Sequence, residues 1–342
     1  MAVTTLTSSS EKRLYMANLY RSAQNQSFWK RYWGSADDEN AVVNADRRPD
    51  KEGGAQCEYV ITPRVAPRSV QGVLDGNERA LSFYYDTMHL DQHREAVIDN
   101  GRLQKIKAFF KIDGPMERFI RNWSTELFDA LHFKAITHDS ANANYFYQGS
   151  ATGESSLTSG DLNTLDSLTE LSVLASTGKS REFEPLRPIM VDGQPKWIYL
   201  CHPDEASDLR KEAESFWQEA MPPGANNPLF KAAKLQWSDV IVIPDRRMPI
   251  KTNAGSVAIS TGVLLGQQAL QAIEGMPFDM VEGEKDWGNQ HGYAGQFVLG
   301  IKAPEFNSKR YGSILIKSAR TNISGANNEA ELNYLSIPTS NQ

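Results

Sequence analysis

Two segments near the start of the chain have the residue pattern of short strands. Cys57, Tyr59 and Ile61 alternate with Glu58, Val60 and Thr62, and residues 81–86 read Leu-Ser-Phe-Tyr-Tyr-Asp. The connection between them contains prolines and glycines, so the pattern predicts an extended hairpin over residues 55–95. Because an isolated two-stranded hairpin is only marginally stable in water, we expect it to lie against a neighbouring molecule. Its candidate contact residues are Arg64, Arg68, Asp75 and Glu78.

The clearest helical pattern begins at Gly114-Pro115. Proline at the first helical position loses no hydrogen bond, and Glu117 in the first turn suits the helix dipole. Apolar residues then recur every three or four positions and predict a long amphipathic helix over residues 115–136. They are Met116, Phe119, Ile120, Trp123, Leu127, Ala130 and Leu131. Shorter helices are expected around 162–174 and over 204–220.

The second half of the chain mixes strand and helix signals. A hairpin is expected over 185–201 around the turn dipeptide at 192–193, and strands at 240–243, 297–301 and 314–316. Residues 261–274 are predicted to form a helix with Gly262, Gly266, Ala269 and Ile273 on one stripe, which would let another element approach closely. Asp286, Trp287 and Gly288 are expected in a turn.

Residues 1–54 lack a clear period but contain large apolar side chains. Residues 1–35 are mainly basic, whereas residues 36–54 are mainly acidic. We interpret this segment as an arm that gains order by lying on a partner, with Phe28, Trp29, Tyr32 and Trp33 as contact residues. A solvated arm is the alternative.

Composition narrows the class of protein. The 342 residues allow two or three folding units, and the net charge of −6 gives no indication of a dedicated nucleic-acid binder. No apolar run is long enough for a transmembrane helix, and the first residues lack the order of a secretion signal. Two widely spaced cysteines favour free thiols and synthesis in the cytoplasm. Candidates for phosphate contact are Arg102, Lys105, Lys107, Lys111, Arg118 and Arg121.

Two segments contain part of a motif for a chemical site. Residues 177–180 read Thr-Gly-Lys-Ser, but Val173 stands where a phosphate-binding loop needs its first glycine. Asp86, His89, Asp91 and His93 could hold a metal if the segment were helical, yet it begins in a strand pattern. The sequence therefore predicts no catalytic, cofactor or metal-binding residue, and no enzyme.

An ordered set of small motifs resembles a known family. Residues 261–320 contain a Gly/Ala-rich segment, the Asp286-Trp287-Gly288-Asn289 turn, Gly300-Ile301-Lys302 and Tyr311-Gly312. This stretch resembles the closing region of the major capsid proteins of the N-four-like podoviruses, with Trp287 where tyrosine is expected. Further matches in the same order are Asp75-Gly76-Asn77-Glu78, Asp91, His202-Pro203, Asp208-Leu209, Asn227-Pro228-Leu229-Phe230 and Trp237-Ser238-Asp239-Val240.

The resemblance implies an α+β protein with the HK-ninety-seven capsid fold. Its parts would be an arm (1–54), an extended hairpin loop (55–95), a peripheral domain with a long spine helix (96–180), an axial domain (181–289), and strands that return to the peripheral domain with a C-terminal tail (290–342). The implied protein is a virion component that forms hexamers and pentamers of itself and closes into an icosahedral shell around double-stranded phage DNA. A separate scaffolding protein, a portal, assembly in the bacterial cytoplasm and no membrane contact are also implied. The alternatives are an encapsulin-like or other shell protein of this fold, a ring-forming adaptor, and a compact cytoplasmic enzyme.

Overall fold

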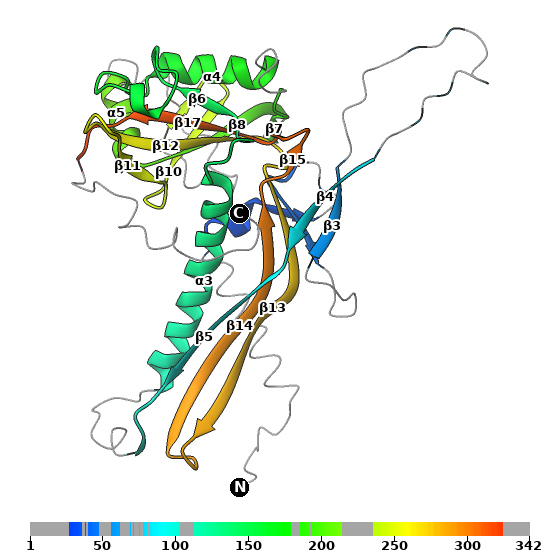
Figure 1. The fold of residues 1–342 in the computed structure, drawn as a ribbon, viewed down its shortest axis with the longest axis vertical. Coiled ribbons are helices and arrows are strands. Elements are labelled where there is room, and N and C mark those ends of the chain that lie inside the picture. The colour runs from blue at the N-terminus through cyan, green and yellow to red at the C-terminus, as the bar shows by residue number, and fades with distance from the viewer. Residues whose placement is uncertain are drawn as a thin grey trace.

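The computed structural model describes residues 27–35, 38, 40–47, 56–61, 83–102, 113–178, 185–191, 193–213 and 235–323, with isolated positions between 69 and 80 (Figure 1). Within these ranges the chain builds two large sheets, one long and two shorter helices, and a projecting hairpin. Several predicted features lie outside them: Arg64, Arg68, residues 214–220 of the second short helix, and the basic residues Lys105, Lys107 and Lys111.

An eight-stranded mixed sheet forms one end of the molecule, in the order β6-β17-β12-β8-β10-β9, with β11 paired to β12 and β7 to β8. Alternate residues of its central strands face two different cores. Tyr199 and Val242 face the helices α4 and α5, whereas Ile198 and Ile241 face the core that contains the long helix. Burial on both faces explains the uninterrupted apolar runs of β8 and β10. The elements are β6 (Tyr145–Tyr147), α4 (Leu165–Thr177), β7 (Ile189–Val191), β8 (Gln194–Cys201), α5 (Pro203–Ala213), β9 (Leu235–Trp237), β10 (Val240–Pro244), β11 (Ile250–Thr252), β12 (Ala258–Leu265) and β17 (Ser313–Ala319).

A second sheet runs away from the first, in the order β1-β2-β13-β14-β5. Its centre is the long antiparallel hairpin of β13 and β14, and α3 lies along this hairpin with contacts to β14 (Figure 1). The predicted spine helix is therefore present, and it begins at Asp113. The elements are β1 (Trp33–Ser35), β2 (Val43–Arg47), β5 (Asp91–Ile98), α3 (Asp113–Thr137), β13 (Leu270–Lys285) and β14 (Gln290–Lys302).

The predicted extended hairpin has its own two-stranded sheet. β3 (Gln56–Ile61) pairs antiparallel with β4 (Tyr84–His89), from Gln56 opposite His89 to Ile61 opposite Tyr84. The pair projects sideways from the body of the molecule (Figure 1). The remaining short elements are the 3-10 turns η1 (Trp29–Tyr32) and η2 (Glu154–Ser156) and the strands β15 (Glu305–Phe306) and β16 (Lys309–Arg310).

The predicted helix over 261–274 is wrong. Residues 258–265 form β12, which pairs with β17 on one side and β8 on the other, and β13 begins at Leu270. A strand buried on both faces has no polar alternation, so its small residues matched a helical spacing by chance. The expected close approach is nevertheless real. A Cβ on Gly262 would lie 2.2 Å from the Tyr199 hydroxyl oxygen, and one on Gly266 would lie 2.6 Å from the backbone oxygen of Arg187.

The sheets also divide the chain differently from the predicted domains. β6 and α4 lie in or on the eight-stranded sheet although they fall within 96–180. β13 belongs to the long sheet although it falls within 181–289, and β17 returns to the eight-stranded sheet. Part of the predicted arm forms β1 and β2 of the long sheet. The chain therefore passes between the two sheets after α3, after β12 and after β14.

Gly266→Leu is expected to destabilise the subunit by about 1–3 kcal/mol through overpacking. The Arg187 oxygen cannot move away cheaply because it also accepts a hydrogen bond from the Gln267 amide at 2.9 Å. Thermal unfolding followed by circular dichroism would measure the loss. Gly283→Leu is the matched control, since a Cβ there meets no heavy atom within 4 Å. Equal melting temperatures for the two variants would contradict the assigned packing.

Candidate functional site

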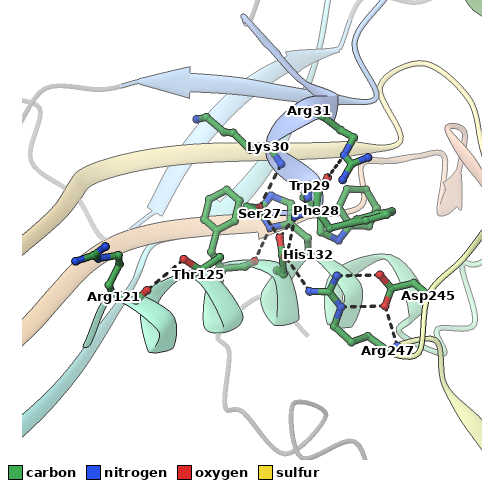
Figure 2. A network of polar contacts seen from close by, with 12 residues as sticks. Ser27, Phe28, Trp29, Lys30, Arg31, Arg121, Thr125, His132, Asp245 and Arg247 are labelled. Atoms are coloured by element: carbon green, nitrogen blue, oxygen red, sulfur yellow. Dashed lines mark hydrogen bonds and ion pairs between the residues drawn. The ribbon is translucent and has the colours of Figure 1, made fainter. Parts of the chain in front are cut away.

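The carboxylate of Asp129 on α3 fixes the N-terminal segment to the body of the subunit. It accepts hydrogen bonds from the Ser27 hydroxyl at 2.5 Å, the Phe28 amide at 2.9 Å and the Trp29 amide at 3.2 Å (Figure 2). These amides begin η1 and have no acceptor within that short helix. A carboxylate from a distant helix thus does the work of an N-cap residue.

Arg247 connects the same carboxylate to the eight-stranded sheet. It lies between β10 and β11, donates to Asp129 at 2.7 Å and binds Asp245 with two further hydrogen bonds at 2.9 and 2.8 Å (Figure 2). Burial alone would lower the pKa of Arg247, but the hydrogen bonds and charges of Asp245 and Asp129 raise it overall. The guanidinium therefore stays charged and joins the spine helix to this loop.

Aromatic rings surround this polar centre. The Trp29 ring stacks on His132 with centroids 5.6 Å apart, and the Phe28 ring lies 5.4 Å from that of Phe133. The Trp33 indole donates to His132 Nε2 at 2.8 Å, so Nδ1 carries the proton and donates to the Phe128 oxygen at 2.7 Å. Burial lowers the pKa of His132 to about 4, which agrees with this neutral form.

The burial of these aromatic residues contradicts their predicted role as contacts with a neighbouring subunit. Phe28, Trp29 and Tyr32 are 8%, 0% and 3% exposed within their own subunit, so they leave no surface for a neighbour. They anchor the segment to its own spine helix instead. Trp33 is half-buried, and its contact with a neighbour stays a prediction. The spacing of the four residues, at i, i+1, i+4 and i+5, is that of one helical face, which could have indicated local packing.

The β3–β4 hairpin is tied to the long sheet at its base. Asp86 accepts hydrogen bonds from the Tyr59 hydroxyl at 2.5 Å and from Lys302 on β14 at 2.7 Å. Burial would raise the pKa of Asp86, but these two donors lower it overall, so the carboxylate is charged. Beyond this base the strands expose apolar side chains, including Val60 at 53% and Tyr85 at 65%. Asp75 and Glu78, two of the candidate contact residues, are also exposed.

The segment that contains the partial metal-site motif is extended. Asp86 and His89 belong to β4, Asp91 and His93 to β5, and Asp86 is bound to Lys302. Across the ranges that the structure describes, no three or more His, Cys, Asp or Glu side chains gather as a metal site would require.

Residues 286–289, which the sequence places in a turn, connect β13 to β14. Asp286, Trp287 and Gly288 all have positive φ, at 51°, 52° and 78°.

Arg102 and Arg118, two of the basic residues that are candidates for phosphate contact, are exposed, and Arg121 is half-buried. Arg118 and Arg121 lie on α3.

Comparison with known proteins identifies the family. The profile described as phage capsid protein matches residues 101–321, about two thirds of the chain. The chain belongs to the phage capsid protein family. A curated relative, the major capsid protein of Pseudomonas phage KPP25, is 23% identical over 87% of this chain and 90% of its own length.

Solved capsid structures share the fold. The capsid of Ralstonia phage GP4 has a TM-score of 0.76 at 22% identity and covers 87% of this chain and 92% of its own. The capsid of cyanophage Pam1 has a TM-score of 0.70 at 16% identity, with 87% and 93% covered. The resemblance seen in the sequence is thus confirmed: this is an α+β capsid protein of the HK-ninety-seven type. It is a structural shell protein of a phage virion.

No helix in the described part of this capsid protein is long and apolar enough to cross a membrane.

Proposed function

We propose that this chain is the repeating subunit that closes into an icosahedral head around double-stranded DNA, through hexamers and pentamers of itself. The observation that carries the proposal is the β3–β4 hairpin, which projects from the body of the molecule (Figure 1). On it the side chains of Val60 and Tyr85 are exposed. Extended elements of this kind bury more area between copies than a compact subunit could. The expressed protein is expected to sediment as particles far larger than a ring, which analytical ultracentrifugation measures.

We also propose partners and a setting that follow from this role. A separate scaffolding protein and a portal would guide closure, assembly would take place in the bacterial cytoplasm, and the subunit itself would catalyse nothing. Packaged DNA would touch the inner face without sequence specificity, with Arg102, Arg118 and Arg121 as candidate phosphate contacts.

An encapsulin-like or other shell or adaptor protein of the same fold is the alternative. Such a particle would enclose protein or form a small ring. Nuclease-protected DNA in particles purified from a phage lysate supports the capsid proposal, and protein cargo without DNA supports the alternative.

The mature subunit is expected to keep residues 27–33. Their burial against α3 makes them part of the core, and the Asp129 carboxylate satisfies their backbone donors. Removing them would expose apolar surface and leave Asp129 without three of its donors. Intact-mass spectrometry of purified particles checks this. A subunit that starts beyond Trp33 would show that the segment is dispensable and contradict its assigned role.

A further inference from the structure

A cavity of about 260 Å³ lies where the end of β14 meets the C-terminal half of α3. Its apolar wall includes Leu131 and Ala135 on α3 and Leu299 and Ile301 on β14. Polar side chains from the start of β5, the segment after α3 and the β15–β16 hairpin complete the lining, among them Asp91, His93, His138, Asn142, Glu305 and Arg310. An apolar wall with a few convergent polar groups is typical of a site for a small ligand.

Arg310 on β16 contributes a buried positive charge to this cavity, because its side chain belongs to a residue that is only 4% exposed. Its guanidinium donates one hydrogen bond, from Nη1 to the Ile136 backbone oxygen at 3.3 Å, and its Nε is buried without a partner. No carboxylate in the part of the chain that the structure describes forms an ion pair with it. Arginine stays charged in proteins, so this charge lies out of water without a compensating anion.

Arg247 shows how the same subunit compensates another buried guanidinium. Burial would lower the pKa of Arg247, yet the hydrogen bonds and charges of Asp245 and Asp129 raise it overall. Burial also lowers the pKa of Arg310, and there the largest opposing contribution, the more distant charge of Glu305, does not offset it. A bound anion would give Arg310 the partner that Arg247 already has.

His138 is a second group that would gain from an anion in the cavity. It makes no hydrogen bond with the described residues, and burial followed by the charge of Arg310 lowers its pKa. The other charged groups that face it are Lys134, which also lowers this pKa, and Asp139 and Glu305, which raise it. The ring is therefore mainly neutral at neutral pH, and an anion beside it would favour the imidazolium. The affinity for that anion should rise as the pH falls.

The remaining charges of the cavity favour an anion with a single charge. Glu305 accepts a hydrogen bond from the Asn142 side chain at 2.7 Å, and Asp91 lines the same cavity. Lys302 is already bound by an aspartate of β4 at 2.7 Å, and burial lowers the pKa of His93 and keeps its ring neutral. Two carboxylates this close would repel a doubly charged phosphate, whereas the aliphatic wall suits the carbon chain of a carboxylic acid.

We propose that this cavity is a carboxylate-binding site in which Arg310 pairs with the carboxylate and His138 assists. The carboxylate can belong to a small organic acid or to an acidic side chain of a neighbouring protein chain in the head, because the same groups would recognise both. The inference goes beyond the proposed shell function and does not rest on it, since the cavity lies within one subunit.

Butyrate is the probe, because it joins one carboxylate to a short aliphatic chain. Isothermal titration calorimetry on the full-length free subunit, against chloride at equal ionic strength, is expected to show one butyrate bound per subunit. Arg310→Gln should weaken this binding about tenfold or more, because the charged partner is lost. Arg246→Gln is the matched control, since Arg246 is exposed and does not line the cavity.

The pH dependence provides a second measurement. Wild type is expected to bind butyrate about threefold more tightly near pH 6 than near pH 8, and His138→Gln should remove this difference. If Arg310→Gln does not fold, because it loses its hydrogen bond to Ile136, this comparison decides alone. The same pH profile for His138→Gln and wild type would then overturn the inference.

Purified shells distinguish the two sources of the carboxylate. Butyrate binding by free subunits but not by shells would assign the carboxylate to a neighbouring protein chain, and binding by both would assign it to a small acid. No binding by free subunits, equal binding by Arg310→Gln and wild type, or tighter binding of inorganic phosphate would each overturn the inference. Absence of shells from wild type would instead overturn the proposed function and leave the result on free subunits unchanged.

Discussion

A subunit that lacks residues 64–77 is expected to fold and to form no shells. The base of the hairpin does not depend on its tip, because Cys57, Tyr59 and Met88 are buried with Ile273 of β13 in a small apolar cluster. Asp86 adds its hydrogen bonds to Tyr59 and Lys302. The deletion is therefore expected to remove the proposed contact with a neighbour and to leave the body of the subunit intact. Circular dichroism would report the fold, and negative-stain microscopy the shells.

A matched control separates length from side-chain chemistry in this experiment. Replacing residues 64–77 by a Gly/Ser segment of equal length keeps the reach of the hairpin and removes Arg64, Arg68 and Asp75. This variant is expected to assemble poorly as well, because the contacts are lost. Normal particles from the deletion variant would refute the role of the hairpin.

Asp129→Ala is expected to destabilise the subunit by about 3 kcal/mol. The change removes the acceptor of three hydrogen bonds from the N-terminal segment and one charged partner of Arg247. Asp245 still binds Arg247, which keeps the loss at the lower end for a broken buried ion pair. A melting temperature lower by several degrees, with weaker protection of residues 27–33 in hydrogen exchange, would be observed.

Asp129→Asn is the control for this prediction. The amide keeps the shape and one accepting oxygen but loses the charge, so its cost should fall between that of alanine and wild type. A melting temperature of Asp129→Ala equal to that of wild type would show that the segment is held by its aromatic rings alone.

Local patterns predicted the parts of the fold that have a clear period or an unbroken apolar run. α3 has one apolar stripe. In β3, apolar and polar residues alternate because one face of the hairpin is buried and the other is exposed. β10 and β17 are buried on both faces too, and their unbroken β-branched and aliphatic runs still predicted strands. β12 was missed because Gly262 and the residues around it break its apolar run and fall at a helical spacing. The long β13–β14 hairpin was only partly predicted, because the sequence indicated its turn and part of β14 but not β13.

The site around Asp129 could not be predicted, because its residues meet through contacts between distant parts of the sequence. Asp129 lies about a hundred residues from the segment that it caps, and nothing near it in the chain marks it as an acceptor. The aromatic residues 28–33 were recognised as anchors, but their partner was assigned to a neighbour when it was the spine helix of the same subunit. Trp287 was noticed only as a departure from the family's turn, because the exposure of its side chain cannot be read from a turn sequence.

Electron microscopy of the purified full-length protein, expressed alone and with its phage's other head proteins, tests the shell function most directly. Closed, hollow particles of uniform size and icosahedral symmetry are the result we expect, with the β3–β4 hairpin of each subunit lying across its neighbour. Compact oligomers or small rings under both conditions, with no closed shell, would contradict the account.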